Sequence, residues 1–400
     1  LVKGITSTGS KAILAGVLPT PAIAYLTKKY NAKAGIVISA SHNPADHNGI
    51  KIFSKDGFKL PDETEHKIEN LILDNNENTE QTNADTNTNT ETLLDAQEQY
   101  IVFLEKATNI ELNNIKIVLD CANGAACNVA PALLKKLGAE VTTLNNTPNG
   151  KNINLNCGAM HPNIAQQAVK EHNADIGISL DGDADRVIVC DENGNEVDGD
   201  HIIAIAAIYL KENSKLSNNT VVATVMANKG FDIAMEKNNI QTTKTKVGDR
   251  YVIEEMRKNN YSLGGEQSGH IIFLDHVTTG DGLLTALQLL KIMKEKDKKI
   301  SELAQCMHSL PQILINIRVK EKPDFGTLPE VTAKVKETED TLGNQGRVLL
   351  RYSGTENLAR VMVEGPNQDE IKTMADEIAN LIKNKIGAEK SKISGTSQKF

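Results

Sequence analysis

The sequence has no uninterrupted apolar run that approaches the ~20 residues of a membrane-spanning helix. Its first residues, LVKG, lack the layout of a signal peptide. It also lacks a basic excess, because 44 lysines and arginines face 52 aspartates and glutamates, which leaves a formal charge of −8. These features argue against a membrane protein and against a general binder of nucleic acid.

Cysteine is scarce and scattered. The five cysteines are Cys121, Cys127, Cys157, Cys190 and Cys306. None belongs to a Cys-x-x-Cys pair, and an odd, scattered set in a long chain is typical of reduced thiols rather than of a disulfide framework or a zinc site. We therefore expect a cytoplasmic protein.

The length of 400 residues exceeds what one compact core usually holds, and about 150 residues per domain predicts two to three domains. The chain starts without Met, and its first apolar stretch, Ala12–Leu18, is typical of the middle of an α/β domain. We therefore expect a fragment that lacks part of its first domain. The predicted segments are an incomplete first α/β domain (1–75), a low-complexity linker (76–92), a second α/β domain (93–195), a third (196–308), a C-terminal α+β domain (309–386) and a tail (387–400).

Alternating apolar strands and amphipathic helices predict the α/β character. The strands Ile115–Asp120 and Glu140–Leu144 flank the helix Val129–Leu137, which makes a βαβ unit. A further strand, Ile176–Leu180, follows the helix Ile164–His172. The loop directly after that strand carries the strongest chemical signal in the sequence.

Three carboxylates, Asp181, Asp183 and Asp185, alternate along this loop. Like charges so close repel one another unless a cation lies between them. Carboxylate oxygens are hard ligands, so Mg²⁺ is the first choice, with Mn²⁺ or Ca²⁺ as substitutes, and the alternative is a solvated acidic turn. An EF-hand fails because Arg186 stands where glycine is needed and because strands flank the loop. Arg186 fits a phosphate that bridges it and the metal.

A second segment, Ser39–Pro44, offers a hydroxyl at Ser41 beside the imidazole of His42. A serine is a poor nucleophile unless it is activated or carries the group to be transferred. A phosphoserine at this position would carry about −1.5 to −2 charges, which the cation of the aspartate loop could neutralise. His42 and Lys51 could move protons or stabilise charge. Taken alone, the segment is also typical of an ordinary turn.

The third segment, Gly265–His270, places polar groups on a turn flanked by glycines. Glu266 and Ser268 project to one side of an extended segment, where they could bind vicinal sugar hydroxyls. A polar surface turn is the alternative.

The fourth segment, Arg351–Thr355, surrounds Gly354 with a guanidinium and hydroxyl groups. Backbone amides and the side chains of Arg351, Ser353 and Thr355 could converge on a phosphate. Such a turn taken alone also carries no function in many proteins.

In this order and spacing, the four segments resemble the α-D-phosphohexomutases, and the similarity runs from Leu14–Pro21 to the final helix. The resemblance implies three α/β domains with mixed sheets around a central cleft, plus a C-terminal α+β domain. It implies a phosphorylated Ser41 and one Mg²⁺ held by Asp181, Asp183, Asp185 and a phosphate oxygen on Ser41. The implied substrate-binding residues are Lys246 in the loop Lys246–Arg250, Glu266, Ser268 and His270 at the sugar, and Arg351, Ser353, Gly354 and Thr355 at the non-reacting phosphate.

Gln267, between Glu266 and Ser268, favours the branch of this family that acts on glucosamine phosphates. The resemblance then implies interconversion of glucosamine 6-phosphate and glucosamine 1-phosphate through a bisphosphate, in the supply of amino-sugar nucleotides and cell-wall precursors. A mutase of mannose or glucose phosphates and a non-catalytic calcium- or sugar-phosphate-binding protein are the alternatives. The expected partners are a phosphorylated amino sugar and a second copy of the chain in a homodimer, and neither nucleic acid nor a membrane.

Three features depart from the family pattern. Ala184 replaces a usual glycine in the metal loop but keeps all three carboxylates. Tyr352 and Asn357 replace a more usual lysine and proline in the phosphate loop. The N-terminal Gly-Thr-Asp-Gly-Ile-Arg segment of the family is absent.

Overall fold

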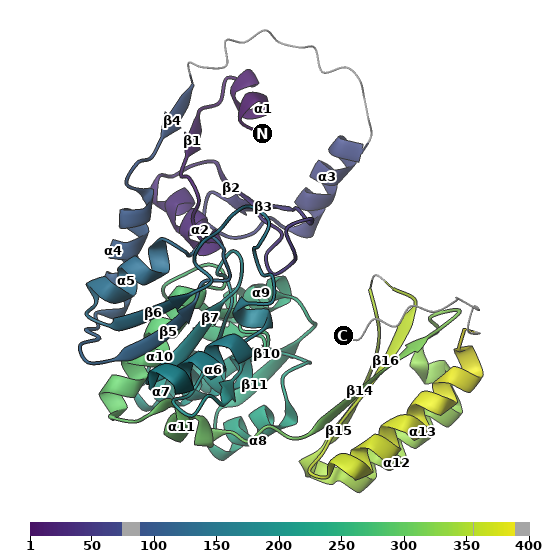
Figure 1. The fold of residues 1–400 in the computed structure, drawn as a ribbon. Helices are drawn as coiled ribbons and strands as arrows, with labels where there is room; N and C mark the ends of the chain where they lie inside the picture. Colours follow the sequence, from purple (N-terminus) through teal and green to yellow (C-terminus); the bar gives the residue numbers. More distant parts are fainter. Residues whose placement is uncertain (74–88, 355, 389–400) are drawn as a thin grey trace. The chain divides into compact units, whose positions relative to one another are not determined.

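The structure, a computed structural model, describes residues 1–73, 89–354 and 356–388 (Figure 1). The chain divides into two compact units: residues 1–227 with 234–307, and residues 228–233 with those from 308 onward. Most of the predicted linker 76–92 lies outside the described residues, but its last residues, Thr90–Thr92, form strand β4. The predicted tail likewise lies outside them beyond residue 388.

The N-terminal part of the first unit carries the Ser41 loop between two short strands. Its elements are α1 (Val2–Ser7), β1 (Ala12–Leu14), α2 (Thr20–Lys29), β2 (Ala34–Ile38), β3 (Ile50–Ser54), α3 (Asp62–Leu73) and β4 (Thr90–Thr92). Strand β1 pairs with β4 in parallel, and β2 pairs with β3 in antiparallel register. Val37 of β2 and Phe53 of β3 pack on Ala24 of α2, which fixes the ends of the loop.

A five-stranded mixed sheet follows, in the order β6-β5-β7-β8-β9. Its strands are β5 (Lys116–Asp120), β6 (Glu140–Leu144), β7 (Ile176–Leu180), β8 (Val187–Cys190) and β9 (Glu196–Val197), with helices α4 (Ala96–Thr108), α5 (Val129–Lys136) and α6 (Asn163–His172). All five residues of β7 are buried, as its apolar sequence predicts. Because β5, β6 and β7 are parallel, their carboxyl ends lie at one edge of the sheet, where the acidic loop begins.

A four-stranded sheet, β11-β10-β12-β13, forms the third part of the first unit. Its strands are β10 (Thr220–Thr224), β11 (Gln241–Thr245), β12 (Leu263–Gly265) and β13 (Ile271–Phe273), with helices α7 (Gly199–Glu212), α9 (Asp249–Asn259), α10 (Gly282–Lys296) and α11 (Ile300–Leu303). Helix α8 (Lys229–Lys237) is divided between the two units, because its residues up to Ile233 belong to the second. The antiparallel strands β12 and β13 form a hairpin whose connection is the predicted sugar loop. The predicted loop at 265–270 is confirmed, but its short flanking strands are not apparent from the sequence pattern.

The second unit is a three-stranded antiparallel sheet with two helices. Its elements are β14 (Gln312–Arg318), α12 (Pro329–Leu342), β15 (Arg347–Tyr352), β16 (Leu358–Glu364) and α13 (Gln368–Ile386), in the strand order β14-β16-β15. Both helices lie along one face of the sheet (Figure 1). Val361 of β16 and Ile378 of α13 belong to the shared core. The predicted C-terminal α+β domain is confirmed.

Sequence periodicity placed most helices and strands within a few residues. Helix α3 leaves apolar residues near its end without cover among the described residues: Leu71 and Ile72 are 81% and 68% exposed. In the residues that the structure describes, no helix combines the length and the apolar content that crossing a membrane requires. The five cysteines are unpaired, and four of them are buried.

Candidate active site

The Ser41 loop and the acidic loop meet in the first unit, although 140 residues separate them in the sequence. Ser41 Oγ donates a hydrogen bond to Asp181 Oδ2 at 3.0 Å. Ligand atoms of Asp181, Asp183 and Asp185 all lie within 4.8 Å of one another, and all three residues are buried. The strand ends of β2 and β7 therefore bring the hydroxyl and the three carboxylates into one site.

One ammonium group lies between two of these carboxylates. Lys51 Nζ, on β3, contacts Asp183 Oδ2 at 2.6 Å and Asp185 Oδ2 at 2.7 Å. The hydroxyl of Thr20, at the start of α2, also donates to Asp183 Oδ2, and the backbone N–H of Thr20 donates to the Asp183 carbonyl at 2.9 Å. The first α/β domain thus supplies a cation and a hydroxyl to the carboxylates of the second.

Burial and neighbouring charges give the carboxylates different pKa values. Burial, together with the negative charges of Asp185 and Asp183, raises the pKa of Asp181 well above its usual range. Burial also opposes ionisation of Asp185, but Lys51 beside it holds the pKa of that carboxyl below its usual range. Burial disfavours charge on Lys51, and the two carboxylates outweigh it and raise its pKa. The site therefore lacks enough positive charge of its own for three ionised carboxylates.

The unsatisfied oxygens fit a divalent metal ion. Asp183 Oδ1 and Asp185 Oδ1 are buried and have no hydrogen-bond partner among the described residues. Buried acceptors without a donor are costly, and hard oxygen ligands of this kind are those that small divalent cations take. Asp181, Asp183 and Asp185 together could hold such an ion next to Ser41 Oγ.

His42 contacts Ser41, and Arg186 contacts Asp181. His42 Nδ1 lies 3.4 Å from Ser41 Oγ, and burial together with Arg186 lowers the pKa of this imidazole. A neutral imidazole can accept a proton at neutral pH. The backbone N–H of Arg186 donates to Asp181 Oδ1 at 3.2 Å, which turns the acidic loop back on itself.

The predicted sugar loop is held against two neighbouring segments. Glu266 Oε1 accepts a hydrogen bond from Gly248 N at 3.0 Å, which joins the loop to Lys246–Arg250. Gln267 Nε2 donates to Asp198 Oδ2 at 3.1 Å, at the N-cap of α7. Gly199 is required there, because a Cβ at that position would lie 2.2 Å from the Glu266 carbonyl oxygen.

His270 differs from Ser268 in exposure. Ser268 is exposed, whereas His270 is 3% exposed. Its Nε2 lies 3.6 Å from Asp249 Oδ2 and 4.0 Å from Asp185 Oδ2. The imidazole of His270 therefore lies between the acidic loop and the loop Lys246–Arg250. This position connects the predicted sugar segment to the predicted metal segment.

The predicted phosphate loop lies in the second unit, at the end of β15. Arg351 pairs across the sheet with Arg360 of β16, and burial together with the charge of Arg360 lowers the pKa of Arg351. Ser353 is buried, and its Oγ accepts from Glu356 N at 3.2 Å. Gly354 is exposed, and Thr355 lies outside the described residues. Two guanidinium groups on neighbouring strands favour an anion beside them.

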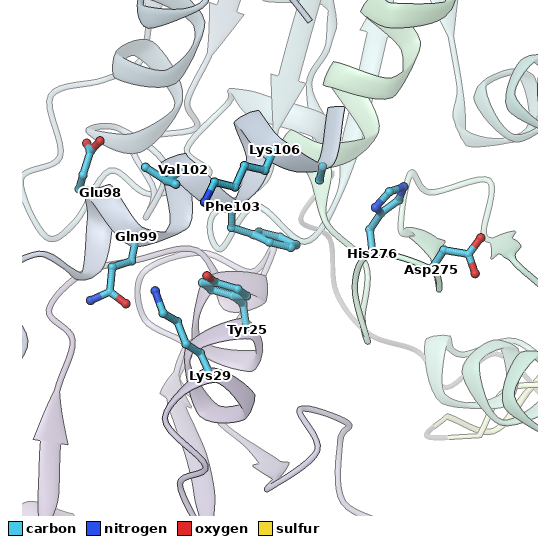
Figure 2. A pocket seen from close by; sticks show the side chains of 10 residues that line it. Tyr25, Lys29, Glu98, Gln99, Val102, Phe103, Lys106, Asp275 and His276 are labelled. Carbon is cyan, nitrogen blue, oxygen red and sulfur yellow. The ribbon is translucent and has the colours of Figure 1, made fainter. Parts of the chain in front are cut away.

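A hollow of 450 Å³ lies elsewhere in the first unit, between α2, α4 and the segment after β13 (Figure 2). The rings of Tyr25 and Phe103 stack there with centroids 4.3 Å apart, and Lys29 lies over the Tyr25 ring. The predicted site residues that the structure describes do not line it. It is distinct from the site around Ser41.

Sequence reasoning missed several residues that touch the site. Thr20 and Asn154 contact the acidic loop and the Ser41 loop from distant segments, and Asp249 contacts His270 and Lys59. A buried threonine between two prolines, Pro19 and Pro21, is a weak signal that its hydroxyl has a partner. Asn154 gives no signal in the sequence alone.

Family models match the four parts of the chain in order. They are described as phosphoglucomutase/phosphomannomutase alpha/beta/alpha domain I (residues 1–79), domain II (98–194), domain III (198–310) and C-terminal domain (314–381). The chain therefore belongs to the phosphoglucomutase/phosphomannomutase family. The predicted fold class, three α/β domains with mixed sheets and a C-terminal α+β domain, is confirmed.

Within the family, the chain is similar to proteins named phosphoglucosamine mutase. It is 55% identical to that of Pelobacter propionicus over 97% of this chain and 86% of the relative, and 53% identical to that of Thermoanaerobacter pseudethanolicus over 96% and 87%. Its fold is similar to that of a phosphoglucomutase/phosphomannomutase family protein from Burkholderia thailandensis (TM-score 0.74, 21% identity, covering 95% and 84%). It is also similar to that of Aspergillus fumigatus N-acetylphosphoglucosamine mutase, crystallised with GlcNAc-6P and magnesium (TM-score 0.69, 18% identity, covering 96% and 98%).

Proposed function

We propose that the chain is a phosphoglucosamine mutase, an isomerase that interconverts glucosamine 6-phosphate and glucosamine 1-phosphate. The observation that carries the proposal is the 3.0 Å contact between Ser41 Oγ and Asp181 within a buried group of three carboxylates. The names of relatives that are 52–55% identical over most of the chain favour glucosamine phosphate over mannose or glucose phosphate.

Asp181, Asp183, Asp185 and a phosphate oxygen on Ser41 would hold one Mg²⁺. When bound, the ion supplies charge neutralisation to the serine phosphate and polarises its phosphorus. A phosphoserine adds about −1.5 to −2 charges beside three carboxylates, so the site needs a cation beyond Lys51. The buried and unpartnered oxygens of Asp183 and Asp185 support this assignment.

Phosphoryl transfer starts from phospho-Ser41. A hydroxyl of the sugar monophosphate attacks the phosphorus, the Ser41 Oγ–P bond breaks and a sugar O–P bond forms, which yields a sugar bisphosphate. A nearby base takes up the proton of that hydroxyl, and Ser41 Oγ takes up a proton as its bond to phosphorus breaks. The restored Ser41 hydroxyl then rests against Asp181 and His42. The bisphosphate then reorients and returns its other phosphoryl group to Ser41. Lys51 and Arg186 stabilise the negative charge that spreads over the transferring group.

The remaining predicted residues would hold the sugar phosphate. Glu266 and Ser268 bind hydroxyl groups of the sugar, and Lys246 and His270 complete that side of the site. Arg351, Ser353, Gly354 and Thr355 bind the phosphate that does not react. The pair of opposed guanidinium groups at Arg351 and Arg360 supports an anion there, because an anion relieves their mutual repulsion.

Replacing Ser41 by alanine tests the nucleophile. The Ser41→Ala variant should retain metal-dependent thermal stabilisation, because the three carboxylates remain, and should lose turnover in a coupled assay with glucosamine 6-phosphate. The same assay run with mannose and glucose phosphates separates the sugar alternatives. Near-normal turnover by Ser41→Ala would refute the proposal, and the exposed Ser10→Ala serves as the matched control.

The proposal includes a cytoplasmic enzyme that acts as a homodimer, with domain boundaries near residues 75, 93, 196 and 309. The unpaired cysteines support a reducing compartment. Light scattering of the purified chain tests the homodimer.

A further inference from the structure

Ser41 has a backbone conformation that a serine rarely adopts. Its φ is 54°, in the left-handed region, where the Cβ crowds the following carbonyl oxygen. Such a conformation persists only where surrounding contacts hold it. The loop itself supplies one of these contacts, from Ser41 N to Ser39 Oγ at 2.9 Å.

The side chain of Asn154 supplies two more. Its Nδ2 donates to the Ser41 carbonyl at 2.8 Å and to the Asn43 carbonyl at 2.9 Å, so both amide hydrogens are used. Its Oδ1 is buried without a hydrogen-bond partner among the described residues. The opposite orientation of the amide would place that oxygen against two carbonyl oxygens, so the contact with the Ser41 loop fixes the side chain.

Asn154 is itself firmly placed. It is 7% exposed, and its backbone N–H donates to the Ala122 carbonyl at 2.9 Å, in the loop that follows β5. Gly182, in the acidic loop, packs against the hydrogen bond between Asn154 and Ser41. A Cβ on Gly182 would lie 2.6 Å from the Ser41 carbonyl oxygen and 2.7 Å from Asn154 Nδ2. Two residues of the second α/β domain, Asn154 and Gly182, thus contact the backbone of Ser41.

We infer that Asn154 is a positioning residue, which directs the side chain of Ser41 toward Asp181 by holding the Ser41 backbone in its left-handed conformation. The inference rests on the proposed phosphoryl transfer at Ser41. Asn154 acts through the carbonyls of Ser41 and Asn43, and its side-chain amide makes no hydrogen bond to the three carboxylates among the described residues. Its loss should therefore impair transfer more than it impairs binding of the sugar phosphate.

The test compares Asn154→Asp with Asn156→Asp in the 400-residue chain. The first variant keeps the shape of the side chain but replaces both donors by a carboxylate that faces two carbonyl oxygens. The backbone of Asn156 is in the left-handed region, with φ 51°, and the residue is exposed. The same substitution there is therefore a matched control. Asn154→Ala, which removes both donors without adding charge, provides a second variant if Asn154→Asp fails to fold.

We expect Asn154→Asp and Asn154→Ala to lower kcat about 100-fold, the loss typical of a misplaced reacting group, with KM for glucosamine 6-phosphate within about twofold of the parent. Amide hydrogen exchange should become faster in residues 39–44 and stay unchanged in β5 and β7. Asn156→Asp should match the parent in both measurements.

A parent-like kcat and parent-like exchange in both Asn154 variants would overturn the inference. So would a loss of activity accompanied by faster exchange throughout the first unit, because that pattern indicates a purely structural role. A parent chain that turns over no hexose phosphate would instead overturn the proposed function, and exchange in residues 39–44 would then decide alone whether Asn154 holds the loop.

Discussion

At the residue scale, the site depends on how the charges of its buried carboxylates are compensated. Lys51 is the ammonium that contacts Asp183 and Asp185, and both carboxylates are almost fully buried. Removing one partner of a buried ion pair leaves an uncompensated charge, which typically costs about 3–5 kcal/mol. In the proposed enzyme, a bound metal ion would therefore share with Lys51 the compensation of these charges.

Lys51→Met should reveal that shared role. Without added metal, we expect the variant to melt at a lower temperature than the parent, because Asp183 and Asp185 lose their ammonium partner. Saturating Mg²⁺ should then raise its melting temperature more than that of the parent, since the ion takes over the compensation. Thermal melts with chelator and with Mg²⁺ measure both effects.

The exposed Lys55→Met is the control, and it should respond to Mg²⁺ as the parent does. Equal Mg²⁺ shifts in Lys51→Met and the parent would contradict the charge argument.

The chemical role of a single residue could be predicted from the sequence where its type requires a particular kind of partner. Three alternating aspartates repel one another unless a cation lies between them, so the acidic triplet was predictable from the sequence as a candidate site. Asn154 was not, because an asparagine satisfies its amide in almost any surroundings, and its partner at Ser41 lies 113 residues away. Ala184, between Asp183 and Asp185, has φ 55°, a conformation in which glycine meets less strain.

At the scale of elements, the site depends on where strands end and how helices begin. The parallel strands β5 and β7 deliver the loops that contain Ala125 and Gly182 to one edge, where Ala125 N donates to the Gly182 carbonyl at 2.8 Å. Apolar periodicity predicted these strands. It could not reveal that the loop between β2 and β3 contacts the loop after β7, because a contact between domains leaves no periodic pattern in either.

The junction of α4 and α10 yields a pH prediction. Asp281 caps α10 by accepting from Leu284 N at 2.9 Å, and it accepts from Tyr100 Oη of α4 at 2.8 Å. Burial raises the pKa of Asp281 from 3.8 to about 6. Between these values the folded protein binds more protons than the unfolded chain, so this carboxyl loses its stabilising contribution as pH rises from about 4 to about 6.

Asp281→Asn keeps the cap and removes the titration. The free energy of unfolding of the variant, relative to the parent, should rise by about 2 kcal/mol between pH ~4.5 and pH ~7.5. Urea unfolding of both proteins at the two pH values measures the change. A difference that is independent of pH would show that the Asp281 carboxyl has the same pKa in both states.

At the scale of the whole molecule, four family domains along one chain account for the order of the four chemical segments. The predicted metal, serine and sugar segments lie in the first unit, and the predicted phosphate segment lies in the second. The four segments could be recognised in the sequence because each has a distinctive composition. Similarity to the relatives, rather than the site geometry, favours the amino sugar, because hydroxyl and amino groups can use the same carboxylate and hydroxyl partners.

The most direct measurement is the intact mass of the purified chain. The account predicts a fraction of molecules with one added phosphate, located on Ser41 by peptide mapping, which disappears when excess glucosamine 6-phosphate and Mg²⁺ are added and is absent from Ser41→Ala. If a phosphate supplied by a sugar bisphosphate never appears on Ser41, or if it persists unchanged in the presence of the sugar monophosphate, phosphoryl transfer through this serine is contradicted.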